Sequence, residues 1–193
     1  MSTPRILTFG GSLRRDSYNQ KLAAIAAQGA REAGAEVTLV ALRDFPMPVF
    51  DGDLEEASGM PEQAKRLKGL FRGHDGLIIS APEYNSGITG ALKNAIDWVS
   101  RAESDDEPPL VAFTGKTAVL CAASPGALGG LRGLVQVRAI LGNIGVNVLP
   151  AQITVRKAHE AFGPDGALLD ATQSAAVKDL GAQLARHLAK LLA

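Results

Sequence analysis

The sequence of 193 residues contains little cysteine, few aromatic residues and no excess of charge of either sign. Its single cysteine, Cys121, excludes an intrachain disulfide. Because Cys121 lies in the apolar run Ala118 to Ala123, we expect it to be a buried hydrophobic side chain and not a nucleophile. His74, His159 and His187 are scattered without the spacing of metal ligands, so no metal site is expected.

The balance of charge and the lack of long apolar runs limit the classes of partner. Twenty Lys and Arg residues offset twenty Asp and Glu residues, so no overall field favours nucleic acid, and we expect a small-molecule partner. No apolar run approaches the length of a membrane span, and a strand begins within the first five residues, which leaves no room for a signal peptide. We therefore expect a cytoplasmic protein without a membrane segment, folded as a single domain over residues 1–193.

Apolar runs typical of strands alternate with helical patterns along the chain. The expected strands are Arg5 to Phe9, Glu36 to Leu42, Gly76 to Ser80, Thr117 to Ala122 and Val146 to Val155. The expected helices run from about Tyr18 to Ala33, after Pro61, from Gly90 to Arg101, from Gly130 to Leu141 and from Asp170 onward. This alternation predicts an α/β fold with a doubly wound, five-stranded parallel sheet of order 2-1-3-4-5 and helices on both faces. Ligands of such sheets bind beyond the carboxyl ends of the strands, here at the loops after strands one, three and four.

The loop Gly10 to Asn19 lies between the first strand and the first helix. Free backbone N–H groups and the helix dipole make such a loop suitable for an anion, and its two glycines allow a tight turn and a close approach to a ligand. The loop lacks the lysine of a P-loop and the glycine spacing of a dinucleotide site. It therefore favours the phosphate of a mononucleotide such as FMN. Ser17 and Gln20 also form a capping-box pattern, so helix capping is a second interpretation, compatible with the first.

Two other patterns are given a smaller role. Gly115-Lys116-Thr117 resembles the end of a P-loop but precedes a strand, so it is interpreted as a polar turn. Ser12 follows two glycines, as in a hydrolase elbow, but Arg14 occupies the position where that motif requires glycine.

The chain resembles the NADPH-dependent FMN reductases, a flavodoxin-like family that includes quinone, azo-dye and chromate reductases. The resemblance rests first on Pro82-Glu83-Tyr84-Asn85 and on Leu92-Lys93-Asn94-Ala95-Ile96-Asp97-Trp98. It extends through Gly11-Ser12-Leu13-Arg14 with Ser17 and Asn19, and through Ser124-Pro125-Gly126 with Gly129-Gly130. The segment after about Arg138 matches only in having a final strand and helix.

This resemblance implies a bound FMN and assigns its contacts. The residues implied to hold the phosphate are Ser12, Arg14, Ser17 and Asn19. Those implied to lie along the isoalloxazine ring are Pro82, Glu83, Tyr84 and Asn85. The segment with Ser124 and Gly126 is expected to face the pyrimidine edge of the ring. Arg15 is expected to face solvent. Glu83 is interpreted as a positioning residue with no proton to transfer, because hydride transfer to the flavin needs no protein base; the alternative is an exposed loop carboxylate.

The predicted function is an FMN-dependent NAD(P)H oxidoreductase. NADPH or NADH delivers hydride to flavin N5 and leaves before an acceptor such as a quinone, an azo compound, chromate or free flavin binds, in a ping-pong cycle. One alternative is an FMN-binding electron-transfer module with a protein partner, although the chain lacks the acidic surface typical of such carriers. Another is a regulatory module without flavin.

The resemblance also implies a homodimer or homotetramer with the flavin near the subunit interface. We expect Asp97 and Trp98 to make the subunit contact, because Trp98 lies off the apolar stripe formed by Leu92, Ala95 and Ile96. Core packing is the alternative for Trp98.

Overall fold

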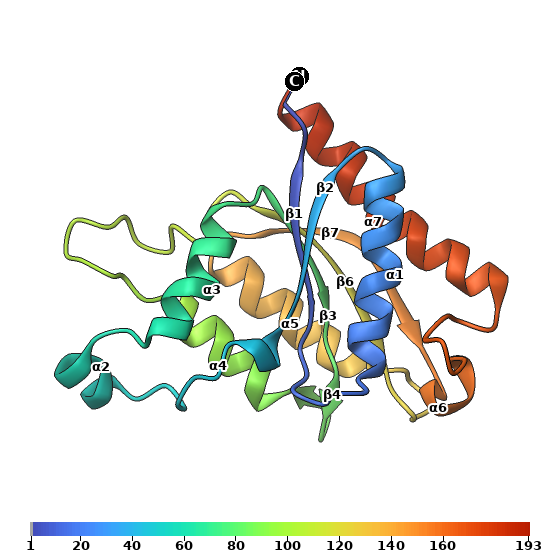
Figure 1. Ribbon diagram of the computed structural model, residues 1–193, viewed down its shortest axis with the longest axis horizontal. Coiled ribbons are helices and arrows are strands. Elements are labelled where there is room, and N and C mark those ends of the chain that lie inside the picture. Colours follow the sequence, from blue (N-terminus) through green and yellow to red (C-terminus); the bar gives the residue numbers. More distant parts are fainter. Residues whose placement is uncertain (1) are drawn as a thin grey trace.

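The computed structural model describes residues 2–193 and shows a five-stranded parallel sheet between two layers of helices (Figure 1). The strands are β1 (Arg5–Gly10), β2 (Glu36–Ala41), β3 (Gly76–Ser80), β6 (Thr117–Ala123) and β7 (Asn147–Val155). Their spatial order is β2-β1-β3-β6-β7, and every neighbouring pair is parallel. The predicted order 2-1-3-4-5 is therefore confirmed.

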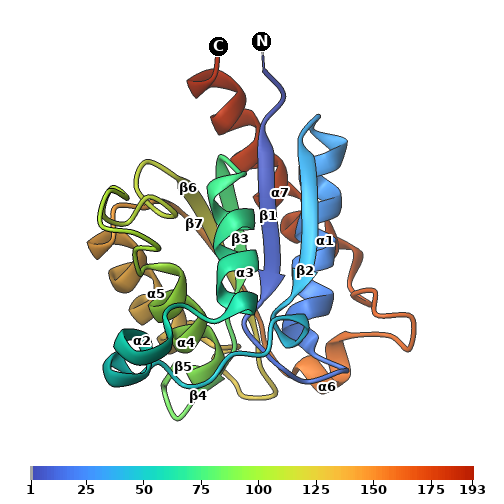
Figure 2. The ribbon, with the colours of Figure 1, turned by 60° about the vertical axis from the view of Figure 1, so that its left-hand side comes forward.

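The long helices divide between the two faces of the sheet (Figures 1 and 2). On one face lie α1 (Tyr18–Glu32) and α7 (Ala171–Leu191); on the other lie α3 (Glu62–Arg72), α4 (Gly90–Val99) and α5 (Leu131–Asn143). Four short features were not predicted: the 3-10 turn η1 (Leu42–Asp44), α2 (Gly52–Ser58), α6 (Ala158–Ala161), and an antiparallel hairpin of β4 (Glu83–Tyr84) and β5 (Gly87–Ile88).

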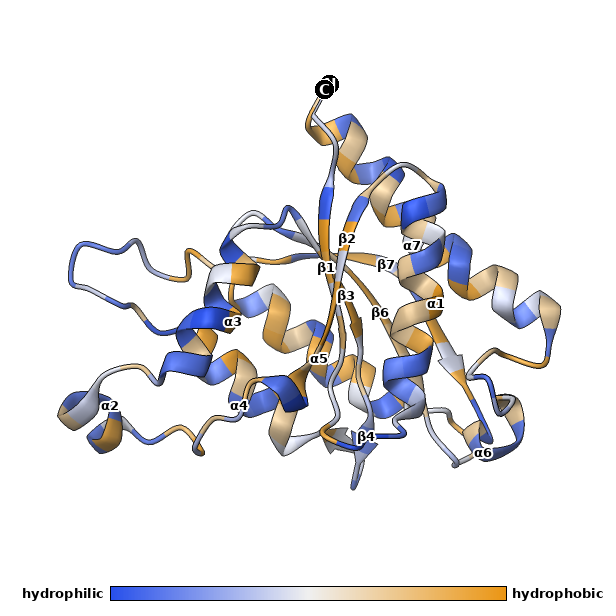
Figure 3. Ribbon diagram, in the orientation of Figure 1, coloured by the Kyte–Doolittle hydropathy of each residue, from blue (hydrophilic) through white to orange (hydrophobic). Residues whose placement is uncertain are grey.

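The strands are largely apolar (Figure 3), and their buried side chains belong to a core on each face of the sheet. On β3, Leu77 and Ile79 join the core beneath α3, α4 and α5, whereas Ile78 joins the core beneath α1 and α7. Burying each such side chain contributes about 1.5–3 kcal/mol. Cys121 of β6 is fully buried, and burial raises the pKa of its thiol to about 12, which agrees with its predicted structural role. Within residues 2–193, no helix combines the length and the apolar character needed to cross a membrane.

Trp98 packs in the core, so the prediction that it makes a subunit contact is wrong. Its side chain is fully buried beside Met60 and Ala64, and its indole N–H donates to the carbonyl of Pro48 at 2.8 Å. The segment between β2 and α3 covers this face of α4, which the spacing of residues within α4 could not show. Neighbouring Asp97 forms an ion pair with Lys93 at 2.6 Å, one turn away on the same helix.

Helices α1 and α7 approach each other backbone to backbone. A Cβ atom added at Gly181 would lie 1.9 Å from the carbonyl oxygen of Ala26, and one added at Gly29 would lie 1.9 Å from that of Lys178. Both glycines are needed because no larger residue leaves room for this contact.

We expect Gly181→Ala to lower the free energy of unfolding by about 3 kcal/mol, because the methyl group forces the two helices apart. Gly69→Ala is the matched control. Gly69 lies in α3, and a Cβ atom added there meets nothing within 4 Å. Because alanine is a better helix former than glycine, this change should raise the free energy of unfolding by about 1 kcal/mol. Urea unfolding followed by circular dichroism measures both. Equal stability of the two variants would contradict the close contact.

Candidate active site

Three loops meet at the carboxyl edge of the sheet and enclose one cavity. They follow β1, β3 and β6, the strands predicted to carry the site. The cavity is lined by Ser12, Arg14, Asp16, Ser17, Tyr18, Asn19, Pro82, Glu83, Tyr84, Ala123, Ser124 and Pro125. The fold thus gathers all the predicted site residues around this cavity except Asn85 and Gly126.

Asn19 fastens the start of α1 to the ends of two strands. Its side chain is buried, and its Oδ1 accepts hydrogen bonds from the Ser80 hydroxyl at 2.9 Å and from the Ala123 N–H at 2.9 Å. Its Nδ2 donates to the Ala123 carbonyl at 2.8 Å. Both lone pairs of Oδ1 are therefore used within the protein, and one amide hydrogen is left for a ligand.

Ser17 and Gln20 define the shape of the first loop. Ser17 caps α1, because its Oγ accepts the Gln20 N–H at 3.3 Å. Gln20 does not complete a capping box. Its side chain accepts the Gly10 N–H and donates to the Val40 carbonyl, both at 2.9 Å. The loop is thus held to β1 and β2, while the hydroxyl hydrogen of Ser17 remains available to a ligand.

Gly10 and Gly11 lie where the first loop packs closely against its neighbours. Neither has a positive φ angle. A Cβ atom at Gly10 would lie 2.7 Å from the backbone nitrogen of Gln20, and one at Gly11 would lie 3.2 Å from the ring of Pro82. The first loop can therefore pass between the start of α1 and the loop that follows β3.

The first loop has positive charge and free donors. Arg14 lines the cavity and Arg15 does not, and neither guanidinium has a hydrogen-bond or ionic partner among residues 2–193. The acidic side chain in the loop, Asp16, pairs with Lys21 at 2.5 Å, which offsets its charge. Ser12 is buried, and its Oγ accepts the backbone N–H of Arg14 at 3.2 Å, so its hydroxyl hydrogen can point to a bound anion.

In the hairpin β4–β5, Tyr84 ends the first strand, and Asn85 and Ser86 form a two-residue turn. Asn85 and Ser86 have φ angles of 51° and 65°, as a type I′ turn requires. Glu83 attaches this hairpin to α5: its Oε2 accepts the backbone N–H groups of Arg132 at 2.9 Å and Gly133 at 3.2 Å, and its Oε1 accepts from Arg132 Nε at 2.9 Å. The carboxylate therefore stabilises the positive end of the helix dipole.

The ionisation of Glu83 follows from these contacts. Burial by itself raises its pKa, but hydrogen bonds from Arg132 and from the Gly133 backbone outweigh this effect, and the pKa lies below its ordinary value. Glu83 is therefore a carboxylate near neutral pH, and its bonds to the backbone of α5 show that it is not the exposed loop carboxylate that the sequence left as an alternative.

Tyr84 and Ser124 are further predicted residues that line the cavity. Tyr84 is about half exposed, with 53% of its surface accessible, and presents an aromatic face. Ser124 Oγ accepts the Gly126 N–H at 3.2 Å, which holds the third loop in place. Tyr84 and Arg14 also line a neighbouring cavity of about 410 Å³, whose lining includes Leu13 of the first loop and Thr89, Gly90 and Ala91 at the start of α4.

Two residues that shape the site were missed from the sequence. Thr89 caps α4 by accepting the Leu92 N–H at 3.1 Å, and its hydroxyl donates to the Gly11 carbonyl at 2.6 Å. Its position before a helical pattern is a capping signal that could have identified it. Arg132 lies 49 residues from Glu83, and no local pattern connects the two.

This fold, with its hydroxyl-rich and arginine-bearing loop at the first strand, defines a flavodoxin-like protein. The sequence profile of the NADPH-dependent FMN reductases matches residues 4–160, and the chain belongs to this family. The predictions of an FMN-dependent reductase and of a flavodoxin-like fold are thereby confirmed.

Individual relatives agree with this assignment. The chain is 35% identical to the NAD(P)H-dependent FMN reductase of Pseudomonas aeruginosa over 167 residues, which cover 86% of this chain and 85% of the relative. It is 34% identical to the quinone reductase of Escherichia coli over 137 residues, covering 71% and 69% of the two chains. Among solved structures, FerB, a flavoenzyme NAD(P)H:(acceptor) oxidoreductase from Paracoccus denitrificans, superimposes with a TM-score of 0.77 at 25% identity, over 97% of this chain and 98% of FerB.

We expect Glu83→Gln to lower the free energy of unfolding by about 2 kcal/mol at neutral pH, because it weakens charge-assisted hydrogen bonds to α5. Because folding lowers the pKa of the Glu83 carboxyl, its ionised form stabilises the fold at pH values above 4.5, the ordinary pKa of a Glu side chain. This stabilisation is lost as the pH falls through the pKa that Glu83 has in the folded protein. The stability difference between wild type and variant should therefore disappear in acid. Urea unfolding at a series of pH values measures it, and a pH-independent difference would contradict this account.

Proposed function

We propose that the chain is an NAD(P)H oxidoreductase that uses FMN to pass electrons from NADPH or NADH to a small-molecule acceptor such as a quinone. The observation that carries this proposal is that the three loops bring free donors and the half-exposed Tyr84 around one cavity. When bound, FMN supplies the hydride-accepting atom and the redox chemistry.

At the phosphate end, Arg14 supplies charge and a forked set of donors, and the Ser12 and Ser17 hydroxyls add neutral donors. Backbone N–H groups in the first loop, at the start of α1, add further donors and the positive end of its dipole. Asn19 holds these groups in position and offers its remaining amide hydrogen. This set binds a phosphate without a metal ion.

At the ring end, Pro82, Tyr84 and the third loop bind a flat ligand. Tyr84 offers its face to stack on a ring, and the backbone near Ser124 and Gly126 lies where a polar ring edge would be. Asn85, at the tip of the hairpin, offers donor and acceptor groups beyond the cavity wall. Glu83 keeps the hairpin on α5, so that these groups are in place before a ligand arrives.

Glu83 has no proton-transfer role in this proposal. Its lowered pKa and its bonds to Arg132 and Gly133 keep it ionised, so it has no proton to give at neutral pH. The chain's residues therefore bind and orient the reactants.

Relatives support the choice of acceptor. The Escherichia coli relative is named a quinone reductase, and a relative from Bacillus that is 32% identical over 120 residues is named an NADPH azoreductase. We propose that reductant and acceptor use the same space beside Tyr84 in turn, which gives ping-pong kinetics.

The first test of this function is reconstitution. We expect the purified protein to take up FMN and to oxidise NADPH faster when a quinone such as menadione is added, with parallel lines in double-reciprocal plots. Absorbance at the flavin and NADPH bands measures both steps. Protein that binds no FMN, or whose NADPH oxidation does not respond to quinone, would contradict the proposal.

A sharper test compares the two adjacent arginines. We expect Arg14→Ala to weaken FMN binding by about 2 kcal/mol, roughly thirtyfold, with activity restored by excess FMN, because Arg14 lines the cavity. Arg15→Ala is the matched control and should leave FMN affinity within about twofold, because Arg15 does not line it. Fluorescence titration of apoprotein with FMN measures both. Equal effects of the two changes would show that the phosphate is not held at Arg14.

A further inference from the structure

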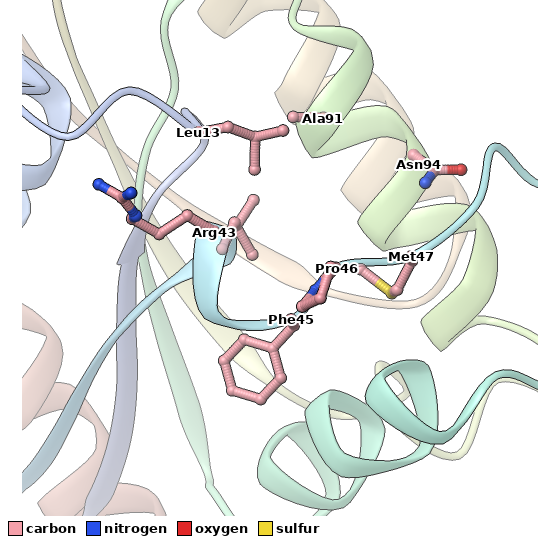
Figure 4. A pocket seen from close by; sticks show the side chains of 8 residues that line it. Leu13, Arg43, Phe45, Pro46, Met47, Ala91 and Asn94 are labelled. Atoms are coloured by element: carbon pink, nitrogen blue, oxygen red, sulfur yellow. The ribbon is translucent and has the colours of Figure 1, made fainter.

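A third pocket, lined mostly by apolar side chains, lies beside the candidate active site between η1 and α4 (Figure 4). Its volume is about 250 Å³. It is lined by Leu13, Leu42, Arg43, Phe45, Pro46, Met47, Ala91 and Asn94. Leu13 comes from the first loop and Ala91 from the start of α4. Their side chains point toward each other on one side of the pocket (Figure 4).

The wall formed by Pro46 and Met47 is held rigidly against α4. Asn94 Nδ2 donates to the Pro48 carbonyl at 2.8 Å, and Asn94 Oδ1 accepts the Phe50 N–H at 2.8 Å. The Pro48 carbonyl also accepts the Trp98 indole N–H at 2.8 Å. The pocket is therefore formed before any ligand binds, as small-molecule sites usually are.

Arg43 is the one charged residue in this lining. Its side chain is exposed and makes no hydrogen bond or ion pair within the part of the chain that the structure describes. Arg43 and Asn94 lie at opposite edges of the pocket with apolar side chains between them (Figure 4). An unpaired guanidinium beside an apolar wall suits a ligand that has both an apolar surface and an anionic group.

The pocket lies next to the proposed active site. It shares Leu13 and Ala91 with the 410 Å³ cavity, which in turn shares Arg14 and Tyr84 with the cavity of the three loops. A ligand in the pocket therefore lies next to the space in which electrons are exchanged.

We infer that this pocket binds a ligand with a planar aromatic ring and an anionic group, with the ring between Leu13, Met47 and Ala91 and the anion at Arg43. Its volume is below the roughly 300–1,000 Å³ of sites for drug-sized ligands, so it accommodates one or two fused rings and not a whole dinucleotide. Two reactants have this chemistry: the adenosine 2′-phosphate end of NADPH and an acidic aromatic acceptor. The inference rests on the proposed function for the role of the ligand, whereas the binding itself is independent of it.

The experiment measures binding of small probes by calorimetry to the full-length, FMN-treated protein. Naphthalene-2-sulfonate represents the acidic acceptor, adenosine 2′-monophosphate represents the dinucleotide, and 2-naphthol is the neutral control. Arg43→Gln removes the charge, and Ala91→Leu fills the pocket. Arg72→Gln is the matched control. It removes an exposed arginine at the C-terminal end of α3, shortly before β3 begins, whereas the pocket lies beyond the carboxyl ends of the strands.

We expect Arg43→Gln to weaken an anionic probe about tenfold while 2-naphthol binding stays within about twofold. Ala91→Leu should weaken both naphthalene probes at least about tenfold, and Arg72→Gln should change neither. If adenosine 2′-monophosphate shows the same two losses, the pocket binds the end of NADPH. If only naphthalene-2-sulfonate shows them, it binds an acidic acceptor.

The inference would be overturned if neither anionic probe bound the wild type, or if the losses were the same in Arg43→Gln and Arg72→Gln. Circular dichroism confirms that each variant is folded. Flavin content, measured on the same samples, separates the two proposals. Protein that holds FMN but not the probes contradicts the pocket alone, and protein that holds the probes but not FMN contradicts the proposed function.

Discussion

The buried amide of Asn19 is the contact on which the geometry of the site depends. It bonds to Ser80 at the end of β3 and to both backbone groups of Ala123 at the end of β6. An unsatisfied buried polar group costs about 1–3 kcal/mol, so α1 cannot shift from these strand ends without losing this stabilisation. The first loop, which runs into α1, is therefore held at a constant distance from the third.

Two further contacts complete this frame. The Thr89 hydroxyl connects the start of α4 to the Gly11 carbonyl, and the Glu83 carboxylate connects the hairpin to the start of α5. Three helix N-termini thus converge on one edge of the sheet, each held by a polar side chain. Loops supported by rigid elements in this way can present donors to a cofactor without first being ordered, so less binding energy is lost when it binds.

The sheet could be predicted from the sequence, whereas several of the short elements around it could not. The strand order could be predicted because the strands are continuous apolar runs and crossovers are right-handed. The hairpin β4–β5 and helix α2 were missed because strands of two residues and a helix of seven have no measurable periodicity. For Trp98 the sequence left both a subunit contact and core packing open, because the residue pattern of α4 does not reveal that the 46–50 segment covers it.

Local patterns in the sequence determine where the helices begin, which loops follow which strands, and which donor types those loops contain, because each depends on residues within a few positions of one another. Only the tertiary structure decides how those donors are used. Asn19 bonds to a residue 104 positions away, and Glu83 to one 49 positions away, whereas Arg14 remains free to bind a ligand. The physical reason is that such partners meet only when packed strands and helices bring distant segments together, and this packing depends on the whole core.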